Sequence, residues 1–180
     1  MLIVFLVSIL YSCGSSSRVT DNAQSQRLEE LVSEKHFEIR SDQAMPMATA
    51  SLNSISDAGL FPPGSSAGQI SLIGNPNYLK VTGDSVAIYL PYFGERQMGG
   101  GYNHDGPGIK LEGIPDEMEI TKDEQKQRYI VQIEMKKATE SFDIEVTLFP
   151  NMNSIISVNS SQRFPIRYSG TVQPIPSEDK

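Results

Sequence analysis

The chain has very little cysteine and no concentrated positive charge. Cys13 is the only cysteine among 180 residues, so no intramolecular disulfide can form and the fold must depend on its hydrophobic core. At 38% hydrophobic residues the chain can build such a core, and we expect one domain. No Lys/Arg cluster is longer than Lys136-Lys137, and the net charge is −7. Because phosphate binding needs a concentrated positive field, we expect neither nucleic acid nor anionic lipid head groups as partners.

Long hydrophobic runs are also missing, apart from one short run at the start. Leu2 to Tyr11 is apolar except for Ser8, which suits a signal peptide and is too short to cross about 30 Å of hydrocarbon. The run ends in Leu10-Tyr11-Ser12-Cys13, which resembles a bacterial lipobox. We therefore predict cleavage before Cys13 and acyl chains on Cys13 that hold the protein at a membrane. The alternatives are an ordinary secretory signal, or a buried strand with a structural cysteine.

Four segments follow from the composition and periodicity of the chain. Residues 1–12 are predicted as a lipoprotein signal peptide, 13–25 as a flexible tether, 26–172 as a single β-rich domain and 173–180 as a disordered tail. The first element of the domain is an amphipathic helix over Gln26 to Phe37, because Leu28, Leu31 and Val32 share one helical face.

Beyond this helix the apolar residues alternate with polar ones, as in half-buried antiparallel strands. Tyr78 to Leu90 predicts a hairpin with its turn at Gly83-Asp84. An extended piece is expected over Ala48 to Ile55, with a long loop over Ser56 to Gly74. Other strands are expected at Phe37–Asp42, Ile109–Glu112, Met118–Thr121, Tyr129–Lys136, Phe142–Phe149, Ser154–Val158 and Phe164–Tyr168. The predicted fold is mainly β, an antiparallel β-sandwich or small β-barrel of about eight strands with one short N-terminal amphipathic helix.

Several of these motifs occur in an order typical of one bacterial family. Asn77-Tyr78, the hairpin turn, Leu90-Pro91-Tyr92-Phe93-Gly94 and Ile166-Arg167-Tyr168-Ser169-Gly170 together resemble the domain of unknown function 4251 family, over roughly Leu28 to Val172. The resemblance implies a secreted or lipid-anchored protein in the cell envelope of a Gram-negative bacterium, most simply at its outer membrane. It implies no activity.

The segment after the predicted hairpin is the main candidate for binding. Pro91 cannot donate to a sheet, and we expect Gly94 to take a backbone conformation that other residues resist, which leaves Tyr92 and Phe93 at a sheet rim. With Arg96, which could engage an anion, they form a candidate binding rim. In the alternative interpretation Tyr92 or Phe93 caps the core. Arg96, Arg163 and Arg167 are otherwise expected to form surface ion pairs worth at most about 1 kcal/mol.

Catalytic and metal-binding patterns are weak, so we predict no catalytic residues, no cofactor and no metal. Asn103, Asp105, Gly106 and Glu112 match part of an EF-hand spacing, but Gly101 stands where a carboxylate should begin coordination. His36 is explained by a place at the end of the predicted helix, and His104 by turn geometry. The acidic residues form, in our interpretation, a charged turn before a strand: Asp116, Glu117, Glu119, Asp123 and Glu124.

Two hypotheses about function remain. The favoured one is a non-enzymatic lipoprotein domain that binds a small ligand, a glycan or an envelope protein. The other is a metal-independent hydrolase or lyase that uses carboxylates or tyrosines in a β-sheet cleft. A buried acidic pair in one cavity would favour the enzyme, and an interior filled by apolar side chains would favour binding.

Overall fold

The computed structural model describes residues 21–97 and 108–176, which form two helices and ten strands. The helices are α1 (Asp21–Ser33) and α2 (Ala50–Asp57). The strands are β1 (His36–Pro46), β2 (Ile70–Ser71), β3 (Tyr78–Thr82), β4 (Ser85–Leu90), β5 (Ile109–Gly113), β6 (Glu117–Asp123), β7 (Arg128–Lys137), β8 (Glu140–Leu148), β9 (Asn153–Ser160) and β10 (Ile166–Gln173). The predicted mainly β architecture with a helix near the N-terminus is confirmed.

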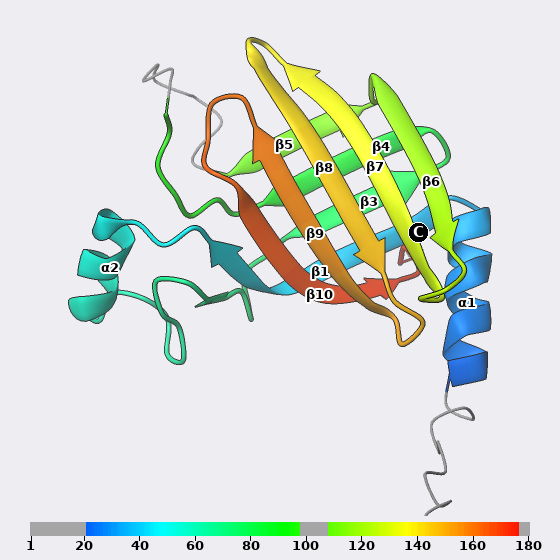
Figure 1. Ribbon diagram of the computed structural model, residues 1–180, viewed down its shortest axis with the longest axis horizontal. Helices are drawn as coiled ribbons and strands as arrows, with labels where there is room; N and C mark the ends of the chain where they lie inside the picture. The colour runs from blue at the N-terminus through cyan, green and yellow to red at the C-terminus, as the bar shows by residue number, and fades with distance from the viewer. Residues whose placement is uncertain (1–20, 98–107, 177–180) are drawn as a thin grey trace, which may run out of the picture.

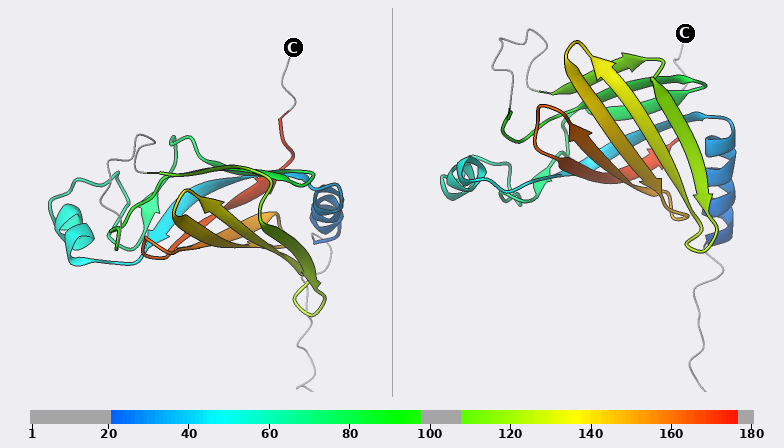
Figure 2. Two further views of the ribbon diagram at one scale, coloured as in Figure 1. Left: turned by 90° about the horizontal axis from the view of Figure 1, so that it is seen from above. Right: turned by 45° about the horizontal axis from the view of Figure 1, so that its top comes forward.

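Nine of the strands form one antiparallel sheet in the order β5-β4-β3-β1-β10-β9-β8-β7-β6, and β2 pairs with β1 beside this path. The sheet curls into a half-barrel, so β6 to β9 pass in front of β3 to β5 (Figure 1). The same curvature brings the two layers face to face when the molecule is seen from above (Figure 2). β5 and β6, which follow one another in the chain, stand at opposite ends of the strand order.

The space between the two layers is filled by the apolar side of each strand. Val131 and Ile133 of β7 and Ile144 of β8 are fully buried, and they belong to one cluster with Leu79 and Val81 of β3. The alternation that predicted these strands therefore reflects burial on the inner face and solvent on the outer face.

Helix α1 covers one open end of the half-barrel. Leu28, Leu31 and Val32 are buried, as their spacing predicted, and Glu29 forms an ion pair with Lys122 of β6 at 3.7 Å. The helix begins at Asp21, within the segment predicted as a tether, and ends at Ser33. It ends there because Lys35 adopts a positive φ of 49°, after which the chain enters β1.

The expected extended piece over Ala48 to Ile55 is wrong, because Ala50 to Ile55 lie in helix α2. The Thr49 hydroxyl accepts a hydrogen bond from the Leu52 amide at 3.3 Å, which caps the helix N-terminus. Of the residues in α2 only Leu52 is buried, and the helix stands apart from the sheet (Figures 1 and 2). The loop that follows is broken by the short strand β2.

A bulge in the central strand allows the sheet to bend sharply. The register of β1 against β10 shifts between Ser41 and Gln43, and the side chain of Asn77 is hydrogen-bonded to the backbone there. Asn77 accepts from the Ser41 amide at 2.8 Å and donates to the Ser41 carbonyl at 2.9 Å. Opposite the bulge, a Cβ on Gly170 would lie 2.0 Å from the Arg40 carbonyl oxygen, so only glycine fits.

Most strand boundaries agree with the alternation to within two residues, and two strands, β1 and β10, extend further. The hairpin of β3 and β4 is confirmed, with Gly83 at a positive φ of 60°. The last strand begins at Ile166 and continues to Gln173, because its pairing with β1 reaches Glu38. Strand β1 continues to Pro46, beyond the predicted end at Asp42. Glu117, Glu119 and Asp123 lie within β6, so the predicted charged turn is wrong at these positions.

Candidate functional site

The predicted binding rim lies just after β4 and is largely engaged in packing. Tyr92 and Phe93 are half-buried against the core. The Tyr92 hydroxyl lies 3.1 Å from the carbonyl oxygens of Glu95 and Phe164, either of which can accept a hydrogen bond from it. Burial raises the pKa of this hydroxyl. Gly94 does not need a left-handed backbone, contrary to expectation. A Cβ there would lie 2.6 Å from the Tyr92 hydroxyl, so any other residue would displace the tyrosine side chain.

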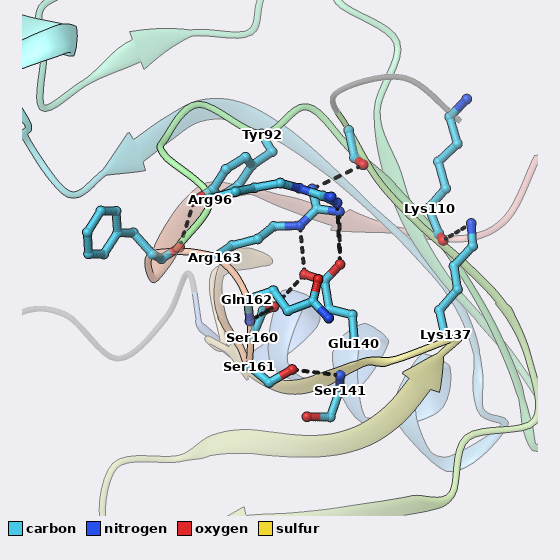
Figure 3. A network of polar contacts seen from close by, with 12 residues as sticks. Tyr92, Arg96, Lys110, Lys137, Glu140, Ser141, Ser160, Ser161, Gln162 and Arg163 are labelled. Atoms are coloured by element: carbon cyan, nitrogen blue, oxygen red, sulfur yellow. Dashed lines mark hydrogen bonds and ion pairs between the residues drawn. The ribbon is translucent and has the colours of Figure 1, made fainter. Parts of the chain in front are cut away.

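Beside Tyr92 lies an ion pair that joins distant parts of the chain. Arg163 precedes β10 and Glu140 begins β8; the Arg163 Nε lies 2.7 Å from Glu140 Oε1, and Nη2 lies 3.2 Å from Oε2 (Figure 3). The Arg163 side chain is only 5% exposed and lies near the rings of Tyr92, at 5.2 Å, and Phe142, at 5.8 Å. The prediction of a surface ion pair is therefore wrong for Arg163.

Arg96 reaches the same carboxylate from the solvent side. Its Nη2 lies 3.5 Å from Glu140 Oε2, and its side chain is 28% exposed. The Ser160 hydroxyl also donates to Glu140 Oε1. Burial opposes ionisation of Glu140, but the hydrogen bonds from Arg163 and Ser160 outweigh it and lower the pKa of this carboxyl. Glu140 is therefore ionised. We use the name Glu140 cluster for the side chains of Tyr92, Arg96, Glu140, Ser160 and Arg163.

Two cationic side chains extend this contact to the edge strand β5. Arg163 Nη1 donates to the Gly108 carbonyl at 3.4 Å, and Lys137 Nζ donates to the Lys110 carbonyl at 3.1 Å (Figure 3). Covering an edge with charged side chains protects its backbone from pairing with other strands. The Glu140 cluster and Lys137 thus connect one layer of the half-barrel to the other.

A separate hollow is lined by the outer face of β3, β4 and β5 together with the end of β7. Leu79, Val86 and Ile88 point inward, so the alternate residues Tyr78 and Tyr89 point outward. Tyr78 stands opposite Tyr89 in the register, and their ring centroids are 6.0 Å apart. The hollow has a volume of about 600 Å³, and we name it the tyrosine–lysine groove. It is lined by Tyr78, Ala87, Ile88, Tyr89, Lys110, Leu111, Glu112, Met135, Lys136 and Lys137.

Lys110 of this groove and the neighbouring Lys80 each lie over the ring of a tyrosine in the lining. Lys110 stands opposite Tyr89 in the register, with Nζ 5.3 Å from the ring centroid, and Lys80 Nζ lies 4.8 Å from that of Tyr78. Neither Lys110 nor Lys136 forms an ion pair with a carboxylate in the described part of the chain. Sequence inspection found only the Lys136-Lys137 pair, because Lys110 lies on β5, which is not paired with β7 and comes near it only through the curl of the sheet. The alternation of outward tyrosine and lysine along β3 to β5 is the signal that could have found it.

A second hollow of about 740 Å³ lies over β9 and β10, against the bulge. Its lining includes Gln43, Asn151, Asn153 and Thr171, with Asp42 as the one ionisable group. This lining offers hydrogen bonds and one carboxyl group but no cation, so the tyrosine–lysine groove is the more specific candidate site.

The other predicted site residues are placed as follows. His36 is the exposed first residue of β1, not the end of a helix, and Arg167 is exposed on β10. Glu112 lies on β5, whereas Cys13, His104 and the other calcium-loop positions fall outside the described residues. In residues 21–97 and 108–176 no group of three His, Cys, Asp or Glu side chains is placed to hold a metal, and neither helix is long and apolar enough to cross a membrane.

Comparison with known proteins identifies the family. No curated protein matches the chain. A crystal structure of a DUF4251 family protein from Bacteroides eggerthii DSM 20697 is similar in fold, with a TM-score of 0.57 and 14% sequence identity over 88% of this chain and 92% of that one. The family model described as "Domain of unknown function (DUF4251)" matches residues 20–172. Because this match spans most of its length, the chain belongs to the DUF4251 family.

Proposed function

We propose that this protein is a lipid-anchored domain of the bacterial cell envelope that binds a ligand or partner and catalyses no reaction. The observation that carries the proposal is the contrast between its interior and its outer face. The interior is packed with apolar side chains, whereas three hollows among the described residues lie at the surface. Binding at an outer face needs no more than such a groove.

The buried carboxylates support this function over hydrolysis. A two-carboxylate hydrolase needs its acid and base on either side of one substrate bond, with their pKa values pushed apart. Among the described residues the buried carboxylates are Glu38 and Glu140, which have separate sets of partners. Burial opposes ionisation of each, but the cations beside it outweigh burial and lower both pKa values, so neither is held as a protonated acid.

In-cell photocrosslinking tests the binding function. A photoreactive amino acid would replace Tyr89 in the groove, Arg96 at the predicted rim, or Lys126 in the β6–β7 turn as a control. We expect a specific adduct from Tyr89 or Arg96, identified by mass spectrometry, and none from Lys126, which is exposed at the other end of β7. Equal adducts from all three positions would contradict a defined binding surface.

The anchor is tested by mass spectrometry of the protein extracted from membranes. We expect a mass increase on Cys13 that corresponds to acyl chains, and release of a Cys13→Ser variant from the membrane fraction. An unmodified Cys13 would overturn the lipid anchor and leave the binding function to be judged by crosslinking.

A further inference from the structure

We infer that the tyrosine–lysine groove binds an acidic carbohydrate, a sugar chain carrying carboxylate, sulfate or phosphate groups. This inference rests on the proposed binding function and names its site and ligand class. The volume of the groove, about 600 Å³, is within the range of small-ligand sites, and a large ring-shaped ligand fits an open hollow of this size.

The floor of the groove suits the ring of a sugar. Tyr78 and Tyr89 lie side by side on the outer face, with Ala87 as a small neighbour on the same strand as Tyr89. Each ring offers an apolar body with a hydroxyl at its tip. A sugar has the matching combination, because its C–H groups form apolar patches and its hydroxyls surround the ring.

The lysine side chains of the groove favour a negatively charged ligand. The chain carries a net charge of −7, yet Lys110 and Lys136 have no ion pair with a carboxylate in the described segments. Glu112 is the one acidic residue in the lining. A neutral glycan would leave both ammonium groups without an anionic partner, whereas a charged one gains charge-assisted hydrogen bonds.

An acidic peptide is the competing ligand, and the edge strand argues against it. An extended peptide that joined the sheet here would pair with the outer edge of β5. The Gly108 and Lys110 carbonyls of that edge already accept hydrogen bonds from Arg163 and Lys137. A sugar chain needs none of these backbone groups, because the outward side chains of the groove suffice to bind it.

The test is a glycan array probed with the full chain in mild detergent. The array would carry neutral, uronic-acid, sulfated and phosphorylated oligosaccharides, with methyl-esterified uronates as neutral counterparts of the same shape. We expect binding to acidic members and at least about tenfold weaker binding to the esterified counterparts. Equal binding of both forms, or no binding of any acidic member, would overturn the assignment, while the crosslinking experiment would still judge the broader function.

Variants locate the site on the best acidic oligosaccharide, measured by calorimetry. Lys110→Gln combined with Lys136→Gln should weaken binding at least about tenfold, because two ionic contacts are lost. Lys126→Gln removes one positive charge far from the groove and should change affinity less than about twofold. Tyr89→Phe tests the hydroxyl, and circular dichroism confirms the fold of each variant. Unchanged affinity of the double variant would move the site elsewhere, and equal affinity for polyglutamate would make the ligand an acidic peptide.

Discussion

Glu38 and Glu140 are both buried and both ionised, but their cations differ in access to water. Glu38 lies on β1 in the middle of the sheet, where Lys80 Nζ is 3.2 Å away and Arg40 donates a hydrogen bond. The Arg40 side chain is 57% exposed and that of Lys80 34%, whereas Arg163 beside Glu140 is 5% exposed. Removing the negative charge therefore leaves hydrated cations at one site and a buried cation at the other.

The two sites also differ in what they hold together. The partners of Glu38 come from β1, the adjacent β3 and, through Gln173 at 3.2 Å, the adjacent β10. Those strands are already joined by backbone hydrogen bonds. The Glu140 cluster joins β8 to the segments after β4 and before β10, and Arg163 also reaches Gly108 next to β5. The contacts of Glu38 therefore join strands that are already paired, while the Glu140 cluster connects the two layers of the sheet.

The largest expected effect is that of Glu140→Gln. The change keeps the shape of the side chain but removes the Glu140 charge beside the buried Arg163 guanidinium. We expect a loss of about 3–5 kcal/mol in the free energy of unfolding, measured with urea. A loss below about 1 kcal/mol would show that Arg163 is neutralised in another way and would contradict the fastening role of the cluster.

The matched change Glu38→Gln should cost less, about 1–2 kcal/mol by the same measurement. Arg40 and Lys80 can turn their charged groups into water when the carboxylate is neutralised, because both side chains are partly exposed. An equal cost for the two glutamine variants would remove the distinction between the sites.

Local periodicity predicted those parts of the fold in which buried apolar residues alternate with exposed polar ones. From Val131 to Met135 of β7 and from Phe142 to Leu148 of β8 every second residue is apolar and buried, so the strands and their inner faces could be predicted directly. Helix α2 was missed because it buries only Leu52, and a helix with a single buried residue has no apolar stripe to reveal it.

The sites depend on register, which local periodicity does not determine. Arg163 was recognised as a cation before a strand, but its burial depends on Glu140, which the pairing of β8 and β9 brings near. The tyrosine–lysine groove needs three strands in register before Tyr78, Tyr89 and Lys110 become neighbours. The binding role of Tyr92, Phe93 and Arg96 stays a prediction.

A smaller and pH-dependent difference should separate wild type from Glu140→Gln. The pKa of Glu140 in the folded protein lies below its ordinary value of 4.5, so its stabilising contribution is fully present above about pH 4.5 and is lost as the pH falls through the lower value. The gap in unfolding free energy between the two proteins should therefore be constant near neutral pH and shrink below about pH 4.5. A gap that widens in acid would mean that the folded protein raises this pKa.

The smallest expected effect concerns Arg96, the second arginine on the same carboxylate. Its Nη2 lies 3.5 Å from Glu140 Oε2 and its side chain is partly exposed, so Arg96→Ala should cost at most about 1 kcal/mol. In the Glu140→Gln background that cost should vanish, because the carboxylate partner is gone, and a double-mutant cycle would measure the coupling. A cost above about 2 kcal/mol would place Arg96 among the groups that fasten the layers. A small cost leaves its guanidinium available at the surface, as the predicted binding rim requires.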